Sequence, residues 1–379
     1  MSDDAFIRPQ WVRGRASRQA HVDVPPGAVE EEHGREGFSG AAAHLTRLHA
    51  PTGWVAIDGP LRPVALDPAR RIDGGGLDAL PIRLLENDDV AIGWWSRPPG
   101  APEWFLRNAD GDVAYFVHEG AGVLETEYGP LSFEAGDLLV VPRGTTHRVV
   151  AEAPTRLLTV EALEAGFSLP DRGLLGRHAL FDPAVVDVPE PEPHDEDGEF
   201  TIRVLRNGTS TDLVFPFHPF DVVGWKGDLA PFRLHARDFR PVVSPRYHLP
   251  PSAHTVLRAP GFVVALFAPR PIETEPGALR VPFFHRNIDY DEVIFYHRGE
   301  FFSRAGIEEG MLTFHPAGIH HGPQPQAIAR SEARGPGGFA DELALNVDAR
   351  HALHLTSDAK DALVEGYEWS WMASPEPQA

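Results

Sequence analysis

The chain has 379 residues and a formal net charge of −21 at pH 7, and it contains no cysteine. The lack of cysteine excludes disulfides, cysteine-based zinc sites, iron–sulfur clusters and thiol nucleophiles, so any metal site has to be built from His, Asp and Glu. The negative charge argues against nucleic acid as a partner, because phosphate binding needs a basic face.

The first residues are mostly polar and charged, and we expect an N-terminal arm over 1–53. The opening segment lacks the apolar core of a signal peptide, and no run approaches the roughly 18 apolar residues that span a bilayer. These features favour a cytoplasmic protein that has no membrane partner.

Short apolar runs bounded by Gly, Pro or Asp follow over 54–185 and predict the strands of a first barrel. An acidic, Pro-rich stretch at 186–200 is predicted to be an exposed connection, because it cannot bury enough apolar surface to fold alone. Strand patterns resume over 201–379, with room for one short helix near the end. The sequence therefore predicts a mainly β chain with two barrels and few helices.

One spacing occurs in both halves of the chain. The segments GDLLVVPRGTTH and GMLTFHPAGIHH share Gly, Pro, Gly and His at identical intervals, and they end at His147 and at His321, the second of two adjacent histidines. With His321 as the matched position, the pattern is typical of a strand, a tight turn set by Pro and Gly, and a His that begins the next strand. This spacing resembles the second motif of cupins, which are small double-sheet, jelly-roll β-barrels.

The first cupin motif normally supplies His-x-His, then Glu, then Gly. The second half offers His285, followed by Glu292, with Asn287 where the second His would stand. Together with His321, these residues give two imidazoles and one carboxylate, which leave adjacent coordination positions open and suit a non-haem Fe(II) oxygenase. Asp291 competes with Glu292, because neighbours on a strand face opposite sides.

The first half lacks a matching ligand motif. Around His118 there is no His-x-His, although His118, Glu125 and His147 form a weaker alternative site. The favoured interpretation is a first barrel that keeps the fold without binding metal.

Longer segments resemble the homogentisate 1,2-dioxygenase family over 85–165 and 210–325. The resemblance is carried by PFFHRNIDYDEVIFYHRGEFFSR, LTFHPAGIHHGPQP, DVVGWKGDLAPFRLHARDF and the segment 108–149. It implies two cupin barrels, a small aromatic substrate and O2 as partners, and cleavage of homogentisate to maleylacetoacetate with Fe(II). It also implies a homo-oligomer, either a trimer or a hexamer.

The resemblance also implies roles for single residues. It assigns proton transfer at the substrate hydroxyl to His248. Phe301 stands where the family has a substrate-contacting Tyr, and Arg304 stands where it has a Lys, so either Arg304 or Arg286 is expected to pair with a substrate carboxylate. The expected substrate-binding residues are His315, His320, Arg304, Phe301, Arg286 and Asn287.

Other functions remain open from the sequence. The alternatives are a ring-cleaving dioxygenase for gentisate or another phenol, a metal-dependent isomerase, and a non-catalytic storage or binding protein with two cupin barrels. Asn287 favours an oxygenase, because it leaves one more coordination position open than a His would.

Overall fold

Strands dominate the protein. The computed structural model describes residues 11–35, 41–72, 75–244, 249, 251–281, 283–301, 303–334 and 337–372. Within these ranges there are two α-helices, α1 (Pro68–Arg71) and α2 (Pro325–Arg334), and six 3-10 helices: η1 (Gly173–Leu175), η2 (Pro183–Val185), η3 (Ala236–Asp238), η4 (Pro251–His254), η5 (Asp358–Ala362) and η6 (Tyr367–Trp369). The prediction of a mainly β chain with few helices is confirmed. No helix in these ranges is long and apolar enough to cross a membrane.

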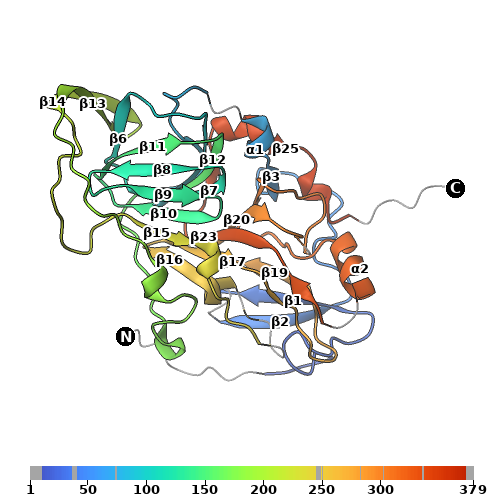
Figure 1. The fold of residues 1–379 in the computed structure, drawn as a ribbon. Helices are drawn as coiled ribbons and strands as arrows, with labels where there is room; N and C mark the ends of the chain where they lie inside the picture. Colours follow the sequence, from blue (N-terminus) through green and yellow to red (C-terminus); the bar gives the residue numbers. More distant parts are fainter. Residues whose placement is uncertain are drawn as a thin grey trace.

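Two sheets form the first barrel, drawn in the upper part of Figure 1. One has the order β15 (Phe232–His235), β10 (Asp137–Val141), β7 (Asp112–Glu119), β12 (Thr155–Ala162), β5 (Val90–Arg97), β4 (Ile82–Glu86) and β24 (His354–Leu355). The other has the order β14 (Thr209–Phe217), β13 (Asp197–Arg206), β6 (Trp104–Asn108), β11 (Thr146–Ala151), β8 (Ala121–Thr126) and β9 (Leu131–Glu134).

Two further sheets form the second barrel. The larger has the order β16 (Thr255–Ala259), β17 (Phe262–Phe267), β23 (Leu343–Ala349), β20 (Asp291–Arg298), β21 (Leu312–His315), β3 (Val64–Leu66) and β25 (Leu363–Val364). The smaller has the order β19 (Phe284–Asn287), β1 (Val29–Gly34) and β2 (Ala42–Arg47), and a short ribbon pairs β18 (Arg270–Pro271) with β22 (Phe339–Ala340).

Alternate residues of the strands fill the first barrel with apolar side chains. Tyr115 and Val117 of β7 belong to one buried cluster with Leu106 of β6 and Leu124 of β8, which lie in the facing sheet. This is the period of two expected for strands that turn one face to a core. The interior of the first barrel is therefore packed with side chains.

The opposite face of the seven-stranded sheet packs on the second barrel. Ala114 and Phe116 of β7 share a buried cluster with Val293 and Phe295 of β20. Because both of its faces are covered, β7 is a continuous apolar run rather than an alternating pattern. The two barrels are thus joined back to back through one apolar core.

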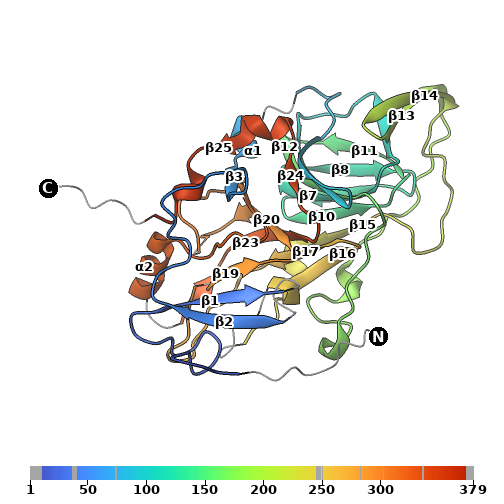
Figure 2. The same ribbon diagram turned by 180° about the vertical axis from the view of Figure 1, so that it is seen from behind.

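The N-terminal residues supply strands to the second barrel. β1 pairs antiparallel with β2 and parallel with β19, so a hairpin within 1–53 lies in the same sheet as His285 (Figure 2). β3, from the range 54–185, pairs with β21, and β15, from the range 201–379, pairs with β10. Strands therefore cross the domain boundaries expected from the sequence, and those boundaries stay a prediction.

A pair of buried histidines connects the two barrels. His118 Nδ1 on β7 lies 3.0 Å from His297 Nδ1 on β20. Burial lowers the pKa of His118, and it lowers the pKa of His297 to about 3. Both side chains are therefore neutral in the folded protein at neutral pH.

This pair predicts a loss of stability in mild acid. Below pH ~6.5, the ordinary pKa of His, the unfolded chain takes up a proton at His297 that the folded chain excludes. The contribution of His297 to the free energy of unfolding should be fully present above that pH. As the pH drops toward about 3, the free energy of unfolding should fall by about 1.4 kcal/mol per pH unit for this one group. Urea unfolding at several pH values should show a shallower dependence for His297→Gln than for the wild type. Equal pH dependence in both proteins would contradict this account.

Candidate metal centre

Backbone hydrogen bonds bring two of the predicted ligands face to face. His285 N donates to His321 O at 2.9 Å, and His321 N donates to His285 O at 3.0 Å. The two residues exchange both backbone hydrogen bonds, as in a hydrogen-bonded pair of antiparallel strands. The turn before His321 needs Gly318, which has φ +82°, and a Cβ at Gly322 would lie 2.8 Å from Phe284 Cα. The Pro-x-Gly-x-x-His-Gly sequence thus brings His321 against β19.

The third ligand is decided between two adjacent carboxylates on β20. Asp291 accepts backbone hydrogen bonds from Ala317 N and Leu353 N, both at 2.7 Å. Glu292 points to the other side, toward His285 and His321. The alternation of side chains along the strand therefore assigns Asp291 to the backbone of neighbouring loops and Glu292 to the site.

The three side chains form a compact group, called here the principal triad: His285, Glu292 and His321. Its potential ligand atoms all lie within 4.8 Å of one another. His285 Nε2 is 3.8 Å from Glu292 Oε2, and His321 Nε2 is 3.6 Å from Glu292 Oε1. Each imidazole directs Nδ1 to a backbone carbonyl, that of Phe283 and that of Ile319, both at 3.1 Å. This fixes Nε2 as the atom that faces the centre.

The electrostatics of the triad suit a cation. Burial and the neighbouring His321 lower the pKa of His285, which keeps its imidazole neutral. Burial alone would raise the pKa of Glu292, but the surrounding imidazoles hold it well below its usual range. Neutral imidazole and ionised carboxylate are the protonation states in which these groups bind metal.

A divalent metal ion fits these residues. In the described part of the chain, His321 Nε2 is buried and has no hydrogen-bond partner, and buried polar atoms in that state call for an explanation. Two imidazole nitrogens and one carboxylate form the donor set of facial-triad iron sites and of three-ligand zinc sites. The donors present therefore suit a first-row divalent cation.

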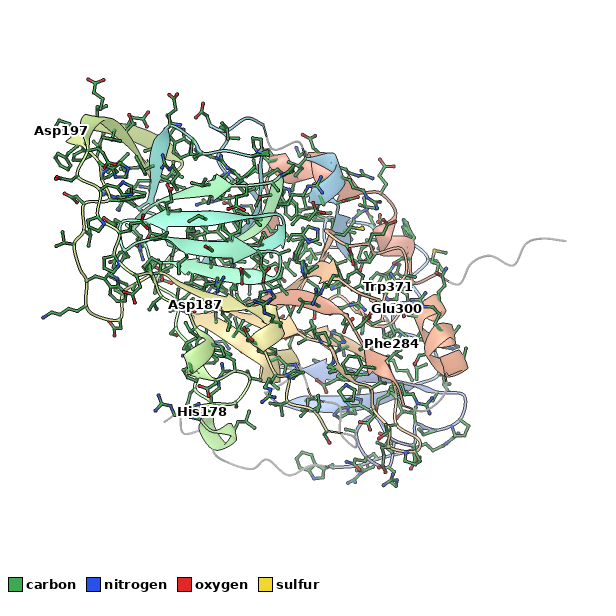
Figure 3. The ribbon with its side chains drawn as sticks, viewed as in Figure 1. His178, Asp187, Asp197, Phe284, Glu300 and Trp371 are labelled. Atoms are coloured by element: carbon green, nitrogen blue, oxygen red, sulfur yellow. The ribbon has the colours of Figure 1, made fainter. Side chains whose placement is uncertain are left out.

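Behind the triad, His315 contacts the Glu292 carboxylate and Tyr367 contacts His315. His315 Nδ1 lies 2.9 Å from Glu292 Oε1, and His315 Nε2 lies 3.0 Å from the Tyr367 hydroxyl. Burial lowers the pKa of His315 to about 3, so its ring is neutral. Trp371, labelled in Figure 3, donates its indole N–H to Gly322 O at 3.0 Å and closes the same side. Tyr367 and Trp371 come from the C-terminal segment, where no motif in the sequence indicates a part in the site.

Replacing His315 with Gln should weaken metal binding. Glu292 would lose the imidazole that fixes its Oε1, and removing such a supporting residue typically costs about 10–100-fold in metal affinity or activity. Tyr367→Phe removes only the outer hydrogen bond and should have a smaller effect. Titration with Co2+ followed by its absorption spectrum measures both. Wild-type affinity in His315→Gln would show that His315 does not orient Glu292.

A pocket opens beside the triad. His285 and Glu292 form part of its wall, and the apolar and aromatic lining includes Leu249, Phe267, Phe283, Ile294, Tyr296 and Ala344. Arg304 also lines it and is only 5% exposed. Burial opposes the charge on Arg304, but Tyr296, Tyr367 and Glu292 raise its pKa above the ordinary value. Arg270 lines the pocket as well, but its Nη2 donates to Glu342 at 2.7 Å. The pocket therefore joins aromatic walls to two guanidinium groups, one of which is paired with a carboxylate.

His254 is a further pocket residue that sequence reasoning missed. It is 4% exposed, and its Nε2 lies 3.0 Å from Val242 O. Asp348 is a second missed residue. It faces Glu292 across the β20–β23 ladder, and burial, with the nearby Glu292, raises its pKa to about 7. Neither lies in a recognisable motif, and only strand pairing brings Asp348 to Glu292.

The other predicted site residues lie in several places. Arg286 and His320 both reach Glu31, with Arg286 Nε and His320 Nε2 each 3.0 Å from Glu31 Oε1. Asn287 accepts a backbone hydrogen bond from Asp289, and Phe301 packs on Tyr296 with ring centroids 4.8 Å apart. Of the expected substrate-binding residues, only Arg304 lines the pocket.

His248 lies outside the described residues. Leu249, the next residue in the sequence, lines the pocket beside His285 and Glu292. A role for His248 stays a prediction.

The alternative site in the first barrel does not assemble. His118 faces His297 at the interface, Glu125 pairs with Arg148, and His147 Nε2 meets the Tyr115 hydroxyl at 3.0 Å. Because the three candidates contact different partners, they form no common ligand group.

Two family models match successive parts of the chain. The family model "Homogentisate 1,2-dioxygenase N-terminal" matches residues 87–235, and "Homogentisate 1,2-dioxygenase C-terminal" matches 239–376. The chain belongs to the homogentisate 1,2-dioxygenase family. The C-terminal match contains the whole principal triad, whereas hairpin β1–β2 precedes both matches.

Individual relatives and solved structures differ in sequence identity and in the share of the chain that they cover. A protein of Saccharolobus solfataricus named "Putative dioxygenase" is 32% identical over 91% of this chain and 93% of its own length. A homogentisate 1,2-dioxygenase of Bradyrhizobium diazoefficiens is 28% identical, and the match covers 70% of this chain but only 62% of that enzyme. Among solved structures, a cupin 2 conserved barrel domain protein from Leptotrichia buccalis has 11% identity and a TM-score of 0.36, covering 76% of this chain and 96% of that one.

Proposed function

We propose that this member of the homogentisate 1,2-dioxygenase family is an Fe(II)-dependent enzyme that opens the ring of homogentisate or a closely related hydroquinone with O2. The observation that carries the proposal is a buried His2Glu triad beside a pocket that is lined by aromatic side chains and by the buried Arg304. Family membership supports a dioxygenase, and the donor set supports iron. By the same family resemblance, we propose a homo-oligomer.

A ferrous ion held by His285, Glu292 and His321 would supply adjacent open coordination positions and the one-electron chemistry that O2 requires. The chain itself must keep the ligands deprotonated and oriented. The backbone carbonyls at Phe283 and Ile319 orient the imidazoles, and His315 orients the carboxylate. The apolar wall limits the water that surrounds the substrate.

Arg304 is positioned to bind an anionic group of the substrate. Its Nη1 donates to Gly322 O at 3.0 Å, while its Nε is buried and has no hydrogen-bond partner in the described part of the chain. A guanidinium in an apolar wall recognises a carboxylate through charge-assisted hydrogen bonds. The carboxylate of homogentisate meets that requirement.

Arg304→Lys should raise KM for a carboxylated substrate more than it lowers kcat. Lysine keeps the charge but loses the planar donor set, so uniform binding of the substrate weakens. Steady-state kinetics with homogentisate and with unsubstituted hydroquinone separate the two effects, because hydroquinone carries no carboxylate. An unchanged KM for homogentisate would remove Arg304 from substrate binding.

The test of the proposed function is oxygen uptake by anaerobically Fe(II)-loaded protein, given homogentisate, gentisate or substituted hydroquinones. We expect uptake in proportion to homogentisate and none with His285→Ala. Uptake with gentisate alone would identify a different phenol as substrate. No uptake with any of them, from protein that holds iron, would overturn the dioxygenase assignment.

A further inference from the structure

A second group with the same donor types as the principal triad lies in the N-terminal residues. It consists of His21, Glu32 on β1 and His44 on β2, called here the N-terminal triad. Its potential ligand atoms also lie within 4.8 Å of one another. It lies outside both family matches, which begin at residue 87.

The distances in the two triads correspond closely. Glu32 Oε2 is 4.0 Å from His21 Nε2 and 3.7 Å from His44 Nε2. The equivalent distances around Glu292 are 3.8 and 3.6 Å. All four are too long for hydrogen bonds. Ligand atoms about 2.0–2.2 Å from one cation lie slightly closer together than this, so a small inward movement of the side chains completes either site.

Strand register builds the N-terminal triad. Glu32 lies opposite His44 in the β1–β2 ladder and opposite His285 in the β1–β19 ladder. Directly paired residues on neighbouring strands project from the same face of a sheet. Glu32 and His44 therefore share their face of the sheet with His285.

The orientation of His21 is fixed by a second carboxylate. Glu30 Oε2 accepts from His21 N at 2.7 Å and lies 3.0 Å from His21 Nδ1, while the imidazole stacks on Phe283 with ring centroids 3.8 Å apart. The bond at Nδ1 directs Nε2 toward Glu32. A carboxylate behind a histidine in this way is the usual support of a metal-binding imidazole.

The Glu32 carboxylate lies between the two imidazoles of the N-terminal triad and is largely buried. Its side chain is 11% exposed, and neither imidazole of the group lies within hydrogen-bond distance of its Oε2. A buried carboxylate without hydrogen bonds or a bound cation is costly, and two imidazole nitrogens at 3.7 and 4.0 Å do not satisfy it. A metal ion at the centre of the group would satisfy all three side chains.

We propose that His21, Glu32 and His44 bind a second divalent transition-metal ion, of the class represented by Zn2+. Two imidazoles and a carboxylate match the three protein ligands of open zinc sites, in which water takes the fourth position. The His44 side chain is 30% exposed, which gives the ion a route from solvent and room for that water. The bound ion would join the segment around His21 to β1 and β2.

The test counts Zn2+ ions per full-length chain after equilibrium dialysis. We expect two ions in the wild type, one in His44→Ala, one in His321→Ala and none in the double variant. His49→Ala is the matched control, since it removes an exposed histidine five residues beyond His44, and it should retain two. Glu32→Gln, which preserves side-chain shape, should repeat the loss if His44→Ala unfolds.

Ion counting is independent of substrate and of turnover, so it succeeds or fails separately from the dioxygenase proposal. Co2+ provides a second measurement, because its visible absorption reports coordination. His321→Ala should still give a Co2+ spectrum, and the spectrum should disappear when His44→Ala is added. One Zn2+ ion in the wild type and none in His321→Ala, or two ions in His44→Ala, would overturn the second site.

Discussion

Glu292→Gln should eliminate iron binding at the principal triad and reduce ring cleavage to background. The amide replaces the carboxylate that lies 3.8 Å from His285 Nε2 and 3.6 Å from His321 Nε2, and a neutral oxygen is a much weaker ligand for a divalent cation. Iron content after anaerobic loading and oxygen uptake measure the two losses. A Glu292→Gln protein that retains both iron and turnover would exclude Glu292 as a ligand.

The matched control is the same change one residue earlier. Asp291 accepts two backbone hydrogen bonds, and Asn can accept only through its single oxygen, which leaves one buried N–H unsatisfied. Asp291→Asn should therefore keep its iron and lose about 1–3 kcal/mol of stability. Loss of iron in Asp291→Asn, with normal iron in Glu292→Gln, would reverse the roles of the two carboxylates.

The second large effect is expected at His248. We propose that this residue accepts or shares the proton of the substrate hydroxyl that is not bound to iron, as the family resemblance implies. A histidine with a pKa near neutrality suits that task, and removing such a group costs roughly 10²-fold or more in turnover. His248→Ala should therefore keep its iron content and lose turnover by that factor.

His254 provides the internal comparison for His248. It is a buried pocket residue, and its Nε2 lies against the Val242 carbonyl. We expect His254→Ala to alter KM or stability while turnover stays within a few-fold of the wild type. Lost turnover in His254→Ala, with normal turnover in His248→Ala, would transfer the proton-transfer role to His254.

The principal triad could be predicted because its spacing reflects local geometry. The Gly-x5-Pro-x-Gly-x2-His pattern encodes a strand and a turn, and Gly136, Gly144, Gly310 and Gly318 all have positive φ in the structure. The motif spacing favours Glu292 over Asp291, but the sequence holds no physical reason that separates the two carboxylates. The choice depends on which of them meets the backbone of residues 317 and 353, which are distant in the chain.

The N-terminal hairpin could not be predicted, because its first strand buries three consecutive glutamates. A run of acidic residues normally indicates a solvated segment, yet Glu30, Glu31 and Glu32 are 2%, 0% and 8% exposed. Glu31 is surrounded by Arg47, Arg286 and His320, which lie far from one another in the sequence. Only tertiary pairing with β19 brings these partners together.

The family resemblance implies that Arg286 and His320 bind substrate, but neither residue lines the pocket. Both adjoin metal ligands in the sequence, but neighbours on an extended chain face opposite sides. His285 and His321 point to the centre, and Arg286 and His320 point to Glu31. Proximity in sequence to a ligand is therefore a poor guide to the pocket unless the alternation of the strand is applied.

The most direct test of the central claim is isotope labelling of the ring-opened product. Fe(II)-loaded protein is given homogentisate under 18O2, and the product is examined by mass spectrometry before its oxygen atoms exchange with water. A dioxygenase that inserts both atoms predicts two labelled oxygens per product molecule. An intact ring, or a ring-opened product without label, would contradict the account.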